Sequence, residues 1–117
     1  MFSDTEIAIM AYELNRGYNH AIGDPWADPP WPGIPQWYRE AVTDGVRAVR
    51  AGMTCRQLHE NWCRYYRRLG WVHGPVKDAM ASPPTHPCLV SYEDLKPDQR
   101  KKTVIFRDVV RTLARIG

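Results

Sequence analysis

The chain has 117 residues, a formal net charge of +3 and 44% hydrophobic residues, which are the size and composition of one globular domain spanning 1–117. No stretch approaches the roughly 18 apolar residues of a transmembrane helix. The start, Met1-Phe2-Ser3-Asp4-Thr5-Glu6, is acidic and lacks the basic segment of a secretory signal. We therefore expect a cytoplasmic protein without a membrane partner.

The three cysteines argue against stabilisation by covalent or metal bonds. Cys55, Cys63 and Cys88 are odd in number and include no CxxC pair. A disulfide framework or a four-cysteine zinc site is not expected from this pattern. We expect small core residues in a reducing compartment, and neither a metal nor a cofactor.

The excess of basic over acidic residues lies in the second part of the chain. Residues 1–46 contain two basic and seven acidic residues, whereas residues 47–117 contain fourteen basic and six acidic residues. A basic surface attracts anions through its field, so an anionic partner is expected on the second part. A solvated basic face without a partner is the alternative.

Periodicity predicts a first helix at about 4–21, capped by Ser3 or Asp4, with an apolar stripe of Ile7, Met10, Ala11, Leu14 and Tyr18. Five prolines then exclude a helix or a central strand from residues 23–36. Because Trp26, Trp31 and Ile34 are costly to expose, we expect this Pro/Trp-rich loop to lie ordered on the core.

Two further helices are expected between Pro35 and Gly70. Pro35 suits the first turn of the second helix, which Gly52 ends. Thr54 and Gln57 fit a capping box for a third helix at 55–69, and Gly70 suits a left-handed C-cap. The apolar side of this third helix holds Leu58, Trp62, Tyr65, Tyr66 and Leu69. Its other side holds Arg56, Arg64, Arg67 and Arg68.

A long connection and a last helix complete the chain. Residues 70–90 show no helical pattern, but Trp71, Val72 and the segment 88–90 favour an ordered loop with short strand-like pieces. Residues 93–95 suit a single turn. Pro97 then opens a last helix, whose buried stripe is Ile105, Phe106, Val109, Val110, Leu113 and Ile116. The expected fold is mainly α, with four helices around one core.

Catalytic motifs are not apparent in the sequence. His59-Glu60 begins like the zinc-protease motif HExxH, but the second histidine position is Cys63. There is no GxSxG, Walker or GxGxxG motif, and the four histidines are scattered. We therefore do not expect an enzyme and assign no catalytic residue.

Aromatic and basic side chains gather around the third helix and the loop after it. Aromatic faces stack on planar bases, and cations bind phosphates, so this combination suits a nucleotide-like anion. We expect stacking by Trp62 or Trp71 and phosphate contacts by Arg64, Arg68 and Lys77. Polar contacts, or positioning of the loop, are expected from His73, Asp78, His86 and Tyr92. The alternative is that the tryptophans are core residues.

Three ordered blocks resemble the RyR domain, the repeat of ryanodine-receptor calcium channels and of small bacterial and phage proteins. These blocks are Leu58-His59-Glu60-Asn61-Trp62, residues 70–78 (GWVHGPVKD) and residues 86–95 (HPCLVSYEDL). The pattern covers about 55–115, and residues 1–52 resemble the leading helical pair of stand-alone members. His73 stands where the family most often has tyrosine, and Ser91 where it usually has proline.

The resemblance implies an N-terminal helical pair at 1–52 and a RyR-repeat core at 53–117. It also implies a small protein of the stand-alone bacterial or phage type. In the channels these repeats occur as tandem pairs, so a single copy is expected to form a homodimer. The family has been proposed to sense nucleotide-derived ligands.

The leading hypothesis is therefore a non-enzymatic protein that binds a nucleotide-derived small molecule, as a sensor or sponge of a nucleotide signal. The first alternative is a protein–protein interaction or homodimerisation module without a small ligand. A third reading, nucleic-acid binding through the basic part, is less well supported because no DNA-binding motif is present.

Overall fold

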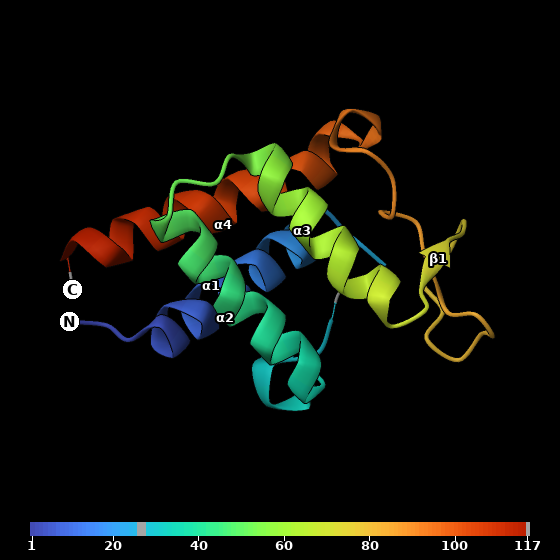
Figure 1. Ribbon diagram of the computed structural model, residues 1–117, viewed down its shortest axis with the longest axis horizontal. Helices are drawn as coiled ribbons and strands as arrows, with labels where there is room; N and C mark the ends of the chain where they lie inside the picture. Colours follow the sequence, from blue (N-terminus) through green and yellow to red (C-terminus); the bar gives the residue numbers. More distant parts are fainter. Residues whose placement is uncertain (26–27, 117) are drawn as a thin grey trace.

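Four helices carry the fold, as the sequence predicts. The computed structural model describes residues 1–25 and 28–116. The helices are α1 (Asp4–Ala21), α2 (Gln36–Arg50), α3 (Cys55–Arg68) and α4 (Pro97–Ile116). Figure 1 shows the start of α1 and the end of α4 at one end of the molecule, with the segment between α3 and α4 at the other. None of the helices in the described ranges has the length and apolarity that a bilayer span requires.

The helix ends follow from local hydrogen bonds. The Ser3 hydroxyl accepts from the Glu6 N–H, and the Glu6 carboxylate accepts from the Ser3 N–H. Thr54 and Gln57 form the same capping box at α3. Two boundaries differ from the prediction. Pro35 is the N-cap of α2 rather than a residue within its first turn, and α3 ends at Arg68, with Leu69 as its C-cap and Gly70 next at φ +88°.

All four helices contribute to the main hydrophobic core, whose buried members are Ile7, Ala8, Ala11, Val46, Ala48, Val49, Leu58 and Val110. α1 packs mainly on α4 and α2, and α3 packs on α2 and α4. Three residues of the predicted stripes are instead exposed: Leu14 (55%), Leu69 (48%) and Ile116 (71%). Leu69 and Ile116 lie at helix ends, beyond the core, whereas Leu14 shows that the inner face of α1 is rotated toward Ala8 and Tyr12.

The Pro/Trp-rich loop is fastened to α1. Its short 3₁₀ helix, η1 (Trp31–Gly33), begins where the Trp31 N–H donates 2.9 Å to the Glu13 carboxylate. The Tyr12 hydroxyl donates 2.5 Å to the Pro29 carbonyl. Ile34 is buried and Trp31 packs on the main core, as predicted. Trp26, the third apolar residue of that prediction, lies outside the described residues.

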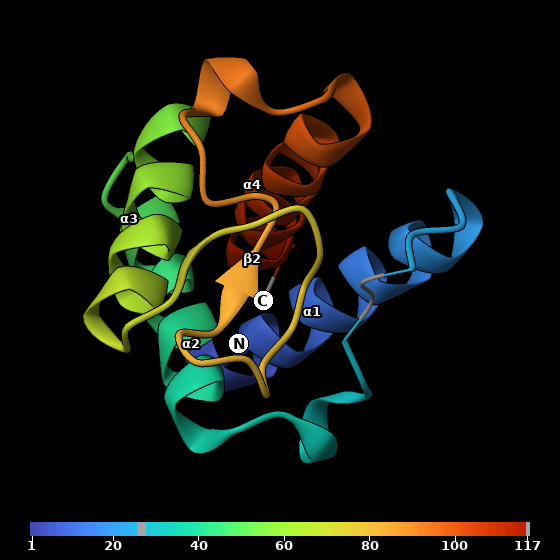
Figure 2. The same cartoon turned by 90° about the vertical axis from the view of Figure 1, so that its right-hand side faces the viewer.

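The segment after α3 is ordered and includes two short strands. β1 (Val72–His73) and β2 (Thr85–His86) pair in parallel, so the second strand precedes the expected 88–90 piece. Figure 2 shows this segment lying across the end of the helices. A second core cluster of Cys63, Tyr66 and Leu89, with Trp37, Trp62 and Trp71 packed on it, holds the segment to α3. A 3₁₀ turn, η2 (Tyr92–Asp94), then leads to α4.

Candidate functional site

A cavity of about 220 Å³ lies between the four helices and the segment at 86–88. We call it the central cavity. Its aromatic lining residues are Tyr12, Tyr38, Trp62, Tyr65 and Phe106. Its amide-bearing lining residues are Asn15, Asn19, Asn61 and Gln99. Its charged lining residues are Arg16, Asp24, Asp28 and Lys102. The cavity thus combines aromatic side chains from every helix with amides from α1, α3 and α4 and with charged groups from α1, α4 and the Pro/Trp-rich loop.

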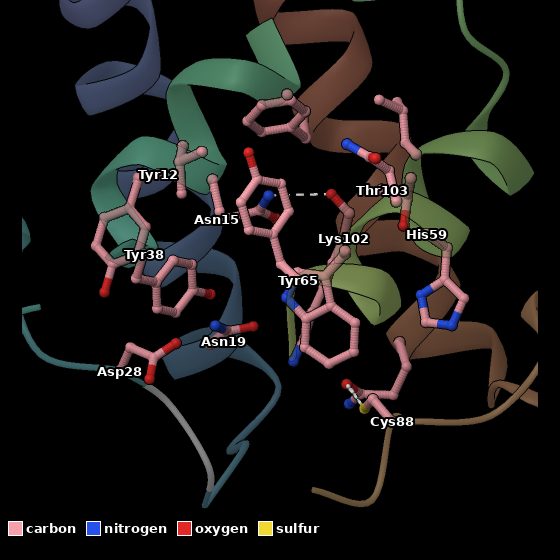
Figure 3. A pocket seen from close by; sticks show the side chains of 18 of the residues that line it. Tyr12, Asn15, Asn19, Asp28, Tyr38, His59, Tyr65, Cys88, Lys102 and Thr103 are labelled. Carbon is pink, nitrogen blue, oxygen red and sulfur yellow. Dashed lines mark hydrogen bonds between the residues drawn. The ribbon is translucent and has the colours of Figure 1, made fainter. Parts of the chain in front are cut away.

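The two ends of the central cavity differ in chemistry. Figure 3 shows Tyr12, Tyr38 and Asp28 together at one end, and His59 and Cys88 at the other. Burial, together with Tyr66 and Asp28, raises the pKa of the Tyr38 hydroxyl well above its usual range. Burial also raises the pKa of the Cys88 thiol, which donates 3.5 Å to the side-chain oxygen of Gln99. Both groups are therefore protonated at neutral pH.

The charged groups of the cavity are neutralised in pairs. Lys102 Nζ lies 2.5 Å from Asp24 Oδ2, which joins α4 to the start of the Pro/Trp-rich loop. Lys77, from the segment after α3, pairs with Asp28 within that loop. Arg16 pairs with Glu13 on α1 at 2.9 Å. The polar lining therefore has little net charge to attract a highly charged ligand into the cavity.

Two asparagines on α1 place polar groups in the cavity wall. The Asn15 amide donates 3.0 Å to the backbone carbonyl of Lys102 on α4. Its own Oδ1 is buried and has no hydrogen-bond partner among the described residues, and the same holds for Asn19 Oδ1 one helical turn later. Buried polar atoms are nearly always hydrogen-bonded, so two unsatisfied oxygens in one cavity wall are a local exception.

His86 is held as a neutral imidazole at the cavity wall. Its Nδ1 accepts 3.0 Å from the Cys88 N–H, so the proton of the neutral ring is on Nε2. Burial, with Lys77 and Lys102 nearby, lowers the pKa of His86 to about 3. The ring also packs edge-on against Trp62, with centroids 4.9 Å apart. His86 can therefore donate one hydrogen bond from Nε2, and the ring stays neutral near neutral pH.

His59 and Cys63, which replace the HExxH pair, are in contact on α3. Cys63 Sγ lies 3.4 Å from His59 Nε2, which also lies 2.7 Å from the Val90 carbonyl. Burial lowers the pKa of His59 and raises the pKa of the Cys63 thiol. Burial thus favours a neutral thiol beside a neutral imidazole, which is the opposite of an activated thiolate pair. Across the described ranges, no three His, Cys, Asp or Glu side chains gather as a metal site would need.

Four of the residues predicted for ligand binding lie at or near the central cavity. Trp62 and His86 line it, and Lys77 reaches it through Asp28. Trp71 lies behind them in the second core cluster, where its ring meets Tyr66 edge-on at 5.0 Å. The structure therefore brings together the aromatic part of the predicted site.

The other five lie away from this lining. Arg64 and Arg68 are exposed on the outer side of α3, and His73 is exposed on β1. Asp78 accepts from the N–H groups of Met80 and Ala81, as expected of a residue that positions the loop. Tyr92 lies in η2, with its ring 6.1 Å from that of His59. The predicted phosphate-binding arginines thus do not face the cavity.

The sequence analysis missed the α1 and α2 side of the cavity. Asn15 and Asn19, Tyr38 and the acidic Asp24 and Asp28 were not selected as site residues. One signal was present, because Asn15 and Asn19 are four residues apart and continue the helical face of Ala8 and Tyr12. The acidic residues could not be placed, because their loop has no periodic pattern.

The geometry defines a small helical domain built around an aromatic and amide-lined cavity. The family model of the RyR domain matches residues 41–117, which include most of α2 and all of α3, the loop and α4. The chain therefore belongs to the RyR domain family. Neither the curated proteins nor the solved structures contain a match to this chain.

Proposed function

We propose that this RyR-domain protein binds, without chemical conversion, the nucleoside part of a nucleotide-derived ligand in its central cavity. The observation that carries the proposal is the cavity itself, with aromatic rings contributed by all four helices and amides by α1, α3 and α4. Ligand pockets typically combine apolar and aromatic walls with a few polar groups that fix orientation. The nucleotide-sensing role that has been proposed for the family agrees with this ligand class.

The size of the cavity favours a small ligand. Its volume is about 220 Å³. Drug-sized ligands occupy pockets of roughly 300–1,000 Å³. A base with its sugar is therefore a better match than a whole dinucleotide, of which only one end would lie inside.

The lining also favours a planar ring. Trp62 and Tyr65 of α3 lie in one wall, with Tyr12 and Tyr38 nearby. Stacking of a base on an aromatic side chain contributes about 1–3 kcal/mol. Because the charged groups are already paired, we assign affinity to stacking and hydrogen bonds rather than to phosphate.

A thermal-shift screen tests the proposal. The probes are adenosine, guanosine, cytidine, uridine, their 5′-monophosphates, NAD and ADP-ribose. A ligand present at a hundred times its Kd stabilises by about 2.7 kcal/mol, which corresponds to a rise in Tm of roughly 3–7 °C for a chain of this size. A rise with at least one nucleoside supports the proposal, and an unchanged Tm with every probe contradicts it.

A cavity-filling variant locates the binding. Ala41 lines the cavity on α2, so Ala41→Leu adds volume there. Ala21→Leu makes the same change at an exposed position at the end of α1. The expected result is loss of the ligand-induced shift in Ala41→Leu alone. Equal shifts in both variants would place the binding elsewhere.

Homodimerisation is a second candidate, favoured by one observation. Four apolar side chains between residues 69 and 80 are exposed by 43–94%: Leu69, Val72, Val76 and Met80. A second copy of the chain would cover them, in keeping with the paired repeats of the channels. Sedimentation of the wild type and of a Val76→Lys, Met80→Lys variant tests this. The candidate requires a dimer that the variant dissociates, and a wild-type monomer at all concentrations eliminates it.

A further inference from the structure

We infer that Asp28 recognises the vicinal hydroxyls of a ribose, so that the central cavity selects ribonucleosides over deoxyribonucleosides. This inference rests on the proposed function and assigns one specificity residue to it. The observation behind it is that, in the described cavity lining, Asp28 is the carboxylate that keeps surface open to a ligand.

The two carboxylates of the cavity lining differ in what a ligand can reach. The Asp24 side chain is 1% exposed, and its Oδ2 accepts from Lys102 at 2.5 Å and from Gln99 at 3.2 Å. The Asp28 side chain is 22% exposed and lines the cavity, where Figure 3 shows it beside Tyr38 at one end. A ligand can therefore touch Asp28 but not Asp24.

The ion pair with Lys77 holds Asp28 in place without using up its acceptors. Lys77 Nζ donates to Asp28 Oδ1. An ionised carboxylate has about four acceptor sites and no donor, so one ammonium group leaves sites for other donors. Hydroxyls on neighbouring carbons supply such donors, and acidic side chains hold ribose through a hydroxyl in dinucleotide-binding folds. Phosphate supplies none and is repelled by the carboxylate, so this end of the cavity fits a sugar.

The base has a stacking surface on Tyr65, which Figure 3 shows between the Asp28 and His59 ends of the cavity. The Tyr65 hydroxyl donates to the Asp44 carboxylate of α2, which fixes the direction of the ring. In the described part of the chain, this ring contacts no other aromatic ring, whereas Trp62 already stacks on His59 with centroids 5.6 Å apart. Tyr65 can therefore take the base while Asp28 takes the sugar.

Nucleosides that differ by one hydroxyl test the inference on the wild-type protein. Adenosine is compared with 2′-deoxyadenosine and 3′-deoxyadenosine, and guanosine with 2′-deoxyguanosine, by isothermal titration calorimetry. For at least one base, we expect the ribonucleoside to bind about 10-fold more tightly, the lower end for a hydrogen bond to a charged group. A preference of less than about fivefold with both bases overturns the inference and leaves the proposed function standing. Absence of binding by all the compounds overturns both.

Substitutions that break the same ion pair assign the preference to Asp28. Asp28→Ala removes the carboxylate, so the preference for ribose should fall below about twofold. Lys77→Ala is the matched control, because it breaks the pair but leaves the carboxylate, and it should keep the preference. Asp28→Asn keeps the size of the side chain and should also lower the preference, because a neutral acceptor binds a hydroxyl more weakly. A preference that persists in both Asp28 variants, or that Lys77→Ala loses equally, overturns the inference.

Discussion

His86 Nδ1 accepts a 3.0 Å hydrogen bond from the backbone N–H of Cys88, two residues further along the chain. This bond fixes the ring between β2 and the second core cluster, where it packs against Trp62 and Tyr66. The His86 side chain therefore belongs both to the segment after α3 and to the wall of the central cavity. The geometry requires the imidazole to be neutral, because protonation of Nδ1 would remove the acceptor.

His86 is expected to make the protein sensitive to acid. Its pKa is about 3 in the folded chain, against 6.5 for an unperturbed histidine. The unfolded chain therefore takes up a proton that folded His86 does not, and stability is lost as the pH falls from about 6.5 toward 3. The free energy of unfolding should fall by up to about 1.4 kcal/mol per pH unit for this group. Urea titrations at several pH values measure the slope.

A substitution isolates this contribution. His86→Asn keeps an acceptor for the Cys88 N–H but cannot be protonated, so it should flatten the decline in stability between pH 6.5 and 3. The remaining slope includes His59, whose pKa is also lowered by burial. A slope unchanged by His86→Asn would contradict the assignment.

Trp71 is expected to support the fold rather than to contact ligand. It packs edge-on against the buried Tyr66 and is absent from the cavity lining. Trp71→Ala should therefore lower the free energy of unfolding by about 3 kcal/mol, at the lower end of losses for large aromatic residues. Ligand affinity measured well below the Tm should stay within about twofold. Normal stability with lost binding would return Trp71 to the binding site.

Gly74 permits the close approach of β1 and β2. A Cβ at this position would lie 2.6 Å from Cβ of Thr85, so Gly74→Ala must displace the strand. We expect a loss of about 1–3 kcal/mol, as in overpacked sites. Gly17→Ala is the control, because a Cβ there meets nothing within 4 Å and alanine favours the helix by about 0.5–1 kcal/mol. Opposite shifts in Tm confirm the account, and a neutral Gly74→Ala refutes it.

The arginines on the outer side of α3 distinguish cavity binding from phosphate or nucleic-acid binding. Arg64 and Arg68 are exposed, and Arg68 lies 6.0 Å from the Tyr65 ring centre. Arg64→Glu with Arg68→Glu should leave nucleoside affinity within about twofold. Binding through this side to duplex DNA would instead show a salt slope of about −0.9 per phosphate contact, which the double variant would reduce. Fluorescence anisotropy with labelled DNA measures that slope.

The helices could be predicted because their signals are local. The capping boxes at Ser3 and Thr54 and the glycine after α3 act within a few residues, and their patterns fixed the helix starts. The rotation of α1 could not be predicted from the sequence. The apolar Leu14 fits the predicted buried stripe and the polar Asn15 does not, but the structure has the opposite arrangement. Only packing against α4, where Asn15 reaches the Lys102 carbonyl, decides which of them faces inward.

The candidate site was harder to predict, because the cavity joins residues far apart in the chain. Trp62 and His86 were selected from their chemistry and do line it. The arginines of α3 satisfied the same chemical argument, but the helix turns them outward. Asp24 and Asp28 enter through ion pairs with Lys102 and Lys77, and no sequence spacing indicates such pairs.

The location of ligand binding can be measured directly by a nuclear magnetic resonance titration of the ¹⁵N-labelled protein with adenosine and guanosine. If the central cavity is the site, the largest shifts will occur at the amides of Asn19, Cys88 and Thr103 and at the Trp62 indole, while Arg64 and Arg68 stay unchanged. Saturable shifts confined to the outer side of α3, or no saturable shift with either nucleoside, would contradict the account.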